Sequence, residues 1–115
     1  MTWEDVVAIG QRLPGVEEGT SYGTPALKVK GKFLTRLRLE DDSLVFSGVP
    51  FYERELLLAM EPDLFHITPH YQDYPAVLAR LSRIDEATIF KFLERRWRSV
   101  APAKLRAAFD SASKA

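Results

Sequence analysis

The chain has 115 residues, of which 46% are hydrophobic and 28% charged, and these proportions are typical of one folded domain. A chain of this length buries about 65% of its unfolded surface, so a single core can hold it without metal or disulfide cross-links. Cysteine is absent, which excludes thiol nucleophiles and thiolate zinc sites. The 16 basic residues balance the 16 acidic ones, so no global field draws the protein to nucleic acid or anionic lipid.

The N-terminal segment predicts a helix that Thr2 caps, with Asp5 three residues later in a capping-box arrangement. Apolar residues at helical spacing form its buried stripe: Trp3, Val6, Val7, Ile9 and Leu13. The sequence Leu13-Pro14-Gly15 ends this helix.

The next part of the chain predicts four short strands separated by turn residues. The strands cover Val16 to Tyr22, Ala26 to Val29, Lys32 to Leu39, and Leu44 to Ser47. The turns contain Gly23-Thr24-Pro25, Lys30-Gly31 and Glu40-Asp41-Asp42-Ser43. Turns this tight connect only antiparallel neighbours, so the strands form a meander.

The second half of the chain predicts three helices and two short strands. A helix over Phe51 to Met60 follows Pro50, which suits a first helical turn. Phe65 to Ile67 and Ala76 to Arg80 are strand candidates on either side of a loop. Asp85 caps a long helix with Ile89, Phe92, Leu93, Trp97 and Val100 as its apolar stripe, and Pro102 starts a final helix from Ala103 to Ala112.

These elements predict an α+β two-layer sandwich in one domain, residues 1–115, with an antiparallel meander sheet covered by helices on one face. The start of the chain lacks a basic n-region and an apolar core, as a signal peptide would have. The longest apolar run, Leu56 to Met60, is too short to cross a bilayer. We therefore expect a cytoplasmic protein with no membrane partner.

Several short motifs occur in this order of elements. They are Leu13-Pro14-Gly15-Val16-Glu17-Glu18, Tyr22-Gly23-Thr24-Pro25, Lys30-Gly31-Lys32-Phe33, Thr68-Pro69-His70-Tyr71 and Trp97-Arg98-x-x-Ala101-Pro102. With them the chain resembles the MmcQ/YjbR family over nearly its whole length. The resemblance implies a frataxin-like (CyaY-like) fold and a double-wing DNA-binding domain with no established enzymatic reaction. Fold alone does not determine function.

Charge is segregated along the chain, although the total is zero. Residues 26–38 have a net charge of +5 and residues 87–115 also +5, whereas residues 39–75 have −7. The first basic segment contains Lys28, Lys30, Lys32, Arg36 and Arg38. Alternation along a hairpin that turns at Lys30-Gly31 places these cations mostly on one face, where a wing would contact phosphates. The same residues could instead be the solvated face of a half-exposed sheet.

A second basic stripe lies on the long C-terminal helix, where Lys91, Arg95 and Arg98 share a face and Arg96 is adjacent. Glu94 weakens the stripe because it can pair with Arg98 four residues later.

Both histidines lie in the segment Phe65 to Tyr71, which includes Thr68-Pro69-His70-Tyr71. His66 and His70 have the spacing of a helical zinc pair, but Pro69 interrupts any helix there, so we expect no metal. His70, Tyr71, Asp73 and Tyr74 could line a concavity, but no catalytic motif accompanies them and we assign no catalytic residue. Frataxins bind iron along an acidic first helix, and this first helix offers only Glu4 and Asp5.

Two functional hypotheses follow, neither with a cofactor. The first is a non-enzymatic, backbone-reading DNA-binding domain that uses Lys28, Lys30, Lys32, Arg36, Arg38, Lys91, Arg95 and Arg98. The alternative is a small-ligand or protein interaction module centred on His66, His70, Tyr71 and Trp97.

Overall fold

The computed structural model describes residues 1–113 and contains one six-stranded sheet with four α-helices. The helices are α1 (Trp3–Gly10), α2 (Phe51–Met60), α3 (Glu86–Val100) and α4 (Ala103–Ser113), with one 3₁₀ turn, η1 (Pro69–Tyr71). The strands are β1 (Val16–Ser21), β2 (Thr24–Val29), β3 (Lys32–Arg38), β4 (Ser43–Ser47), β5 (Phe65–His66) and β6 (Ala76–Arg80).

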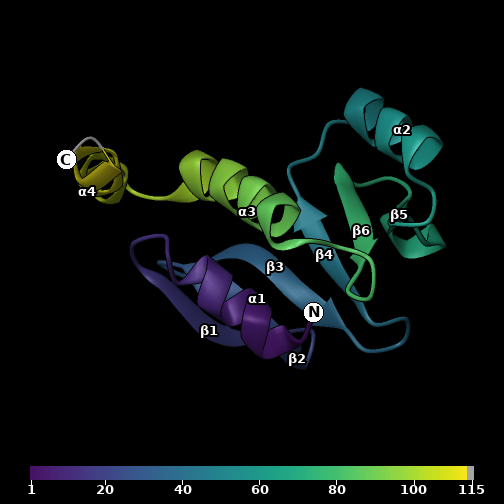
Figure 1. The fold of residues 1–115 in the computed structure, drawn as a ribbon, viewed down its shortest axis with the longest axis horizontal. Coiled ribbons are helices and arrows are strands. Elements are labelled where there is room, and N and C mark those ends of the chain that lie inside the picture. The colour runs from purple at the N-terminus through teal and green to yellow at the C-terminus, as the bar shows by residue number, and fades with distance from the viewer. Residues whose placement is uncertain (114–115) are drawn as a thin grey trace.

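The strands lie in the order β1-β2-β3-β4-β6-β5, and every neighbouring pair is antiparallel. Helices α1 and α3 lie across one face of the sheet and contact each other, while α2 packs beside β5 and β6 (Figure 1). The α+β sandwich predicted from the sequence is confirmed. Within residues 1–113, no helix is both long and apolar enough to span a bilayer.

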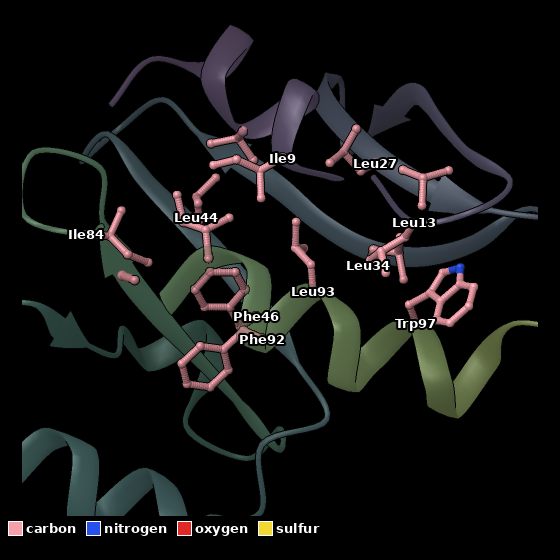
Figure 2. Packing of buried hydrophobic residues seen from close by; sticks show 14 of the residues in the cluster. Ile9, Leu13, Leu27, Leu34, Leu44, Phe46, Ile84, Phe92, Leu93 and Trp97 are labelled. Atoms are coloured by element: carbon pink, nitrogen blue, oxygen red, sulfur yellow. The ribbon is translucent and has the colours of Figure 1, made fainter. Parts of the chain in front are cut away.

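The main core lies between the sheet and the helices (Figure 2). Phe46 of β4 stacks on Phe92 of α3 with ring centroids 4.8 Å apart. Trp97, fully buried, donates its indole N–H to the Pro14 carbonyl at 3.0 Å and packs against Phe109 of α4 at 5.3 Å. Trp97 therefore joins α3, α4 and the α1–β1 connection in one cluster.

Local signals in the sequence explain most element boundaries. The capping box is present: the Thr2 hydroxyl accepts from Asp5 N–H at 3.2 Å, and the Asp5 carboxylate accepts from Thr2 N–H at 2.9 Å. The Asp85 carboxylate likewise accepts from Thr88 N–H at 2.8 Å at the start of α3. Hydrogen bonds with the Thr2 backbone and side chain lower the pKa of Asp5, and those with the Thr88 side chain and backbone lower the pKa of Asp85, because they favour the charged carboxylate.

Two boundaries differ from the prediction by more than one residue. Helix α1 ends at Gly10 because the chain tightens into an i→i+3 turn, in which Leu13 N–H bonds to Gly10 carbonyl at 3.0 Å. Thr24 and Pro25 belong to β2, since the β1–β2 turn uses only Tyr22 and Gly23. Both turn residues have positive φ, as a type I′ hairpin turn requires.

A β-bulge in β3 changes which side chains face the helices. Leu27 pairs with Thr35 and Lys28 pairs with Phe33, so Leu34 has no partner on β2. Leu34 is buried among the helices, whereas Phe33 packs on the opposite face of the sheet. Strict alternation would place Phe33 and Arg36 on opposite faces of the sheet, whereas the bulge places both on the open face.

Replacement of Trp97 should test its position in the core. We expect Trp97→Ala to lower the free energy of unfolding by about 3 to 5 kcal/mol, because it leaves a large cavity and an unpaired carbonyl. Urea denaturation followed by circular dichroism measures this loss. Trp3→Ala is the matched control and should cost less, because the Trp3 ring is only partly buried and its N–H bonds to Glu18 at the surface. Equal losses in the two variants would contradict this assignment.

Candidate functional site

A hollow of about 430 Å³ opens on the sheet face opposite α1 and α3. Its floor is a small apolar cluster that includes Val45, Tyr71 and Ala76, with Phe33 packed beside it. The hollow lies where β3 and β4 diverge, because their pairing begins only at Thr35 and Phe46. The loop that contains η1 borders it on one side and the β1–β2 turn on the other. We call this hollow the Arg36 pocket.

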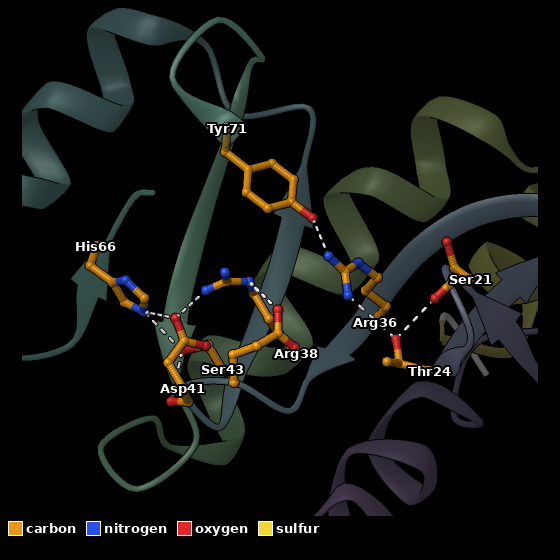
Figure 3. Close-up of polar contacts among 9 residues, drawn as sticks. Ser21, Thr24, Arg36, Arg38, Asp41, Ser43, His66 and Tyr71 are labelled. Atoms are coloured by element: carbon orange, nitrogen blue, oxygen red, sulfur yellow. Dashed lines mark hydrogen bonds and ion pairs between the residues drawn. The ribbon is translucent and has the colours of Figure 1, made fainter. Parts of the chain in front are cut away.

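Arg36 of β3 lies in the pocket and is only 7% exposed. Its Nη2 donates to the Tyr71 hydroxyl at 2.6 Å and its Nη1 to the Thr24 hydroxyl at 3.4 Å (Figure 3). Within residues 1–113, Arg36 forms no ion pair, and its buried Nε has no hydrogen-bond partner. A buried guanidinium without a carboxylate costs several kcal/mol, so the pocket favours an anion.

A second arginine borders the pocket from the helix layer. Arg96 of α3 donates from Nε to the Phe33 carbonyl at 3.2 Å, and it also lies beside Gly48. Gly48 has a φ of +77°, a conformation that favours glycine, where β4 leaves the sheet. The residues that line the pocket include Arg36, Arg96 and His70 but no aspartate or glutamate. The lining therefore carries positive charge alone.

Five aromatic rings line the pocket, and four of them form a cluster around His70. His70 contacts the rings of Tyr22, Tyr71 and Tyr74 at centroid distances of 6.4, 4.7 and 5.9 Å. The Arg36 guanidinium lies 5.1 Å from the Tyr22 ring centroid and 6.0 Å from that of Tyr71. Cation–π contacts and the hydroxyls of Tyr71 and Thr24 thus replace the carboxylate that would normally partner a buried arginine.

Arg54 of α2 fixes the loop beside the pocket. It is 4% exposed, and its guanidinium donates to the carbonyls of Tyr71, Gln72, Tyr74 and Ala76 at 2.8 to 3.3 Å. These bonds hold Tyr71 and Tyr74 in place relative to β6. Arg54 is not among the site residues predicted from the sequence. The available signal was its position as the one basic residue in the acidic segment 39–75.

The structure separates the cations that the sequence analysis grouped for DNA. Arg36 is buried, Arg38 pairs with Glu40 and Asp41, and Arg95 pairs with Glu53. Arg98 pairs with Glu94 and Asp110, whose hydrogen bonds raise its pKa. The expectation that the hairpin cations are open to phosphates is therefore wrong for Arg36 and Arg38. The four lysines of the predicted set enter no ion pair within residues 1–113: Lys28, Lys30, Lys32 and Lys91.

The predicted grouping of His66, His70, Tyr71 and Trp97 is correct only in part. His70 and Tyr71 line the Arg36 pocket, whereas Trp97 is in the main core. His66 lies in a separate polar cluster, where its Nε2 is 2.8 Å from the Ser43 hydroxyl and 3.7 Å from Asp41 (Figure 3). In residues 1–113, no group of three or more histidine or acidic side chains is placed to hold a metal ion.

The environment of His66 makes stability depend on pH. Burial lowers the pKa of His66 below its ordinary value of 6.5, and nearby Arg80 and Arg38 also lower it, against Asp41. The folded state therefore disfavours the imidazolium. The contribution of neutral His66 to stability is fully present above the unfolded-state pKa of about 6.5. This contribution is lost as the pH falls from there through the lower folded-state pKa.

We expect the free energy of unfolding to decrease between pH 7.5 and pH 5 more in the natural protein than in His66→Gln. Glutamine does not titrate and can still bond to the Ser43 hydroxyl. Urea denaturation at several pH values measures this difference. A difference between the two proteins that stays constant with pH would show that His66 is not the responsible group.

Comparisons with known proteins add a family but no activity. No model of a known protein family matches the sequence, and no solved structure matches it. A protein of Mycobacterium bovis and a protein of Mycobacterium tuberculosis, both described as uncharacterised, are each 31% identical to the chain over 122 residues. The alignments cover 94% of this chain and 95% of the mycobacterial proteins. The chain therefore belongs to the same family as these mycobacterial proteins.

Proposed function

We propose that the protein binds a small organic anion in the Arg36 pocket. The observation that carries the proposal is a guanidinium that is almost fully buried, has no ion pair within residues 1–113 and lies in the pocket lining. Arg36 can offer a planar, bidentate set of donors, which suits a carboxylate or a phosphate. This proposal keeps the loop-centred alternative from the sequence but replaces His66 and Trp97 by Arg36 and Arg96.

The size and lining of the pocket support a small molecule. Its volume of about 430 Å³ falls within the range of ordinary ligand sites. The walls are aromatic or aliphatic, and the charged donors are few, as in sites where polar groups orient a ligand and apolar surface supplies affinity. Arg54 holds the neighbouring loop through four carbonyls, so the pocket is largely preformed.

Binding of organic anions should depend on Arg36. We expect carboxylates and phosphates to raise the melting temperature and to give measurable isothermal titration heats, whereas their neutral amides and alcohols do not. Arg36→Gln should weaken anion binding at least about tenfold, since a charge-assisted hydrogen bond contributes about 1.5 to 3 kcal/mol.

Arg83→Gln is the matched control, because Arg83 is exposed and lies outside the pocket lining. It makes the same change of charge and should leave binding unchanged. Equal weakening in both variants would mean that only the overall charge matters, and the proposed site would then be incorrect. Circular dichroism of Arg36→Gln establishes that the variant is folded.

We propose DNA contact as a second function, supported by Lys30 and Lys32. Both are exposed beside the β2–β3 turn and neither forms an ion pair within residues 1–113. Membership of the MmcQ/YjbR family, the frataxin-like fold and a cytoplasmic location stay predictions alongside it.

If DNA binds through Lys28, Lys30 and Lys32, three phosphate contacts give a log–log salt slope of about −2.7, against about −4.5 for five contacts. Fluorescence anisotropy with a duplex oligonucleotide at several salt concentrations measures the slope. Replacing the three lysines by glutamate should abolish binding, while Arg36→Gln should leave it intact. Binding that survives the triple replacement would exclude the hairpin.

A further inference from the structure

We propose that the ligand of the Arg36 pocket carries a planar aromatic ring beside its acid group, and that Tyr22 and Tyr74 bind this ring at the pocket mouth. The inference rests on the proposed function, because it assumes that Arg36 binds the acid group. It assigns the ligand to the aromatic carboxylates or nucleoside phosphates, which share a flat ring and an anionic group.

The first observation is the conformation of Tyr22. This residue has a φ of +53° at the tip of the β1–β2 hairpin and is 80% exposed. Asparagine or glycine adopts this conformation at lower cost, and a bulky residue there is an outlier. A tyrosine contributes nothing that the turn itself needs. Its ring is instead directed to the pocket, where it contacts His70 and the Arg36 guanidinium.

The second observation is the difference between two tyrosines of one loop. Tyr71 is buried and bonds through its hydroxyl to Arg36, while Tyr74 is 56% exposed. The Tyr74 backbone is nevertheless fixed, since its carbonyl accepts from Arg54 at 2.8 Å. Tyr74 therefore presents a partly uncovered aromatic ring on a rigid support. A ring held in this way loses little conformational entropy when a flat ligand covers it.

The third observation is how charge and rings are distributed in the pocket. Arg36 lies at the buried end, and the exposed rings of Tyr22 and Tyr74 lie at the mouth. A ligand whose acid group reaches Arg36 therefore places its other end between aromatic surfaces. A neighbouring hollow of about 290 Å³ shares Gly48 and Arg96 with the pocket, so a ligand with an additional polar part also has room.

Matched pairs of ligands test the inference. In one arm, isothermal titration compares benzoate with cyclohexanecarboxylate, which have equal charge and similar size but differ in aromaticity. In a second arm it compares adenosine 5′-monophosphate with ribose 5-phosphate. We expect the aromatic member of at least one pair to bind about fivefold or more tightly, as stacking on a tyrosine ring provides. The pair with the larger preference distinguishes an aromatic acid from a nucleotide.

Tyr22→Asn should remove most of this preference while keeping the hairpin, because asparagine favours positive φ in such turns. Tyr74→Leu should reduce it as well. Leu39→Asn is the control, since Leu39 is an exposed apolar residue that lines neither hollow. This variant should retain the full preference.

The outcomes separate this inference from the proposed function. Equal binding within both pairs, with loss of all binding in Arg36→Gln, would overturn the aromatic assignment and leave the anion site intact. An aromatic preference that persists in both Tyr22→Asn and Tyr74→Leu would place the ring elsewhere and also overturn it. Failure of every anion to bind would contradict the proposed function itself.

Discussion

The pocket on the open face of the sheet depends on the hydrogen bond between the Arg36 guanidinium and the Tyr71 hydroxyl. A positive charge that is 7% exposed, with a phenol, a threonine hydroxyl and two aromatic rings as neighbours, is incompletely stabilised within residues 1–113. Burial without a carboxylate is costly even when the geometry is good. The buried position of the Arg36 guanidinium is maintained by the surrounding fold. A bound anion would offset the free-energy cost of burying this charge.

The position of Arg36 depends on two features far apart in the sequence. The bulge at Leu34 turns Phe33 to the open face, so that Phe33 and Arg36 both reach the pocket although they are three residues apart. Arg54 holds the loop of Tyr71 and Tyr74 by four carbonyl bonds. Without the bulge, Phe33 would face the helices. Without Arg54, Tyr71 would lose the support that brings its hydroxyl to Arg36.

The local elements were predictable from sequence because their causes are local. The Thr2 and Asp85 caps, the Lys30-Gly31 turn and the apolar spacing of α3 all act within a few residues. The site was harder to predict from the sequence, because it depends on long-range contacts. The charge pattern identified Arg36 as a cation, but the Tyr71 contact that buries it spans 35 positions. The alternation of apolar and polar residues in the sequence does not mark the position of the bulge. The role of Arg54 appears only when the loop is folded against α2.

The two basic segments do meet in the folded chain, but not as a broad positive surface. Arg36 comes from residues 26–38 and Arg96 from residues 87–115, and both line the same pocket. Most other arginines of these segments are neutralised locally, as Arg38 is by Glu40 and Asp41 and Arg95 is by Glu53. Ion pairing thus neutralises most arginines of the outer surface, while Arg36 and Arg96 lie in a hollow with low-dielectric walls, where electrostatic attraction is stronger. A concave site of this kind discriminates by the shape of a ligand, which a polyanion contacted only through its backbone does not require.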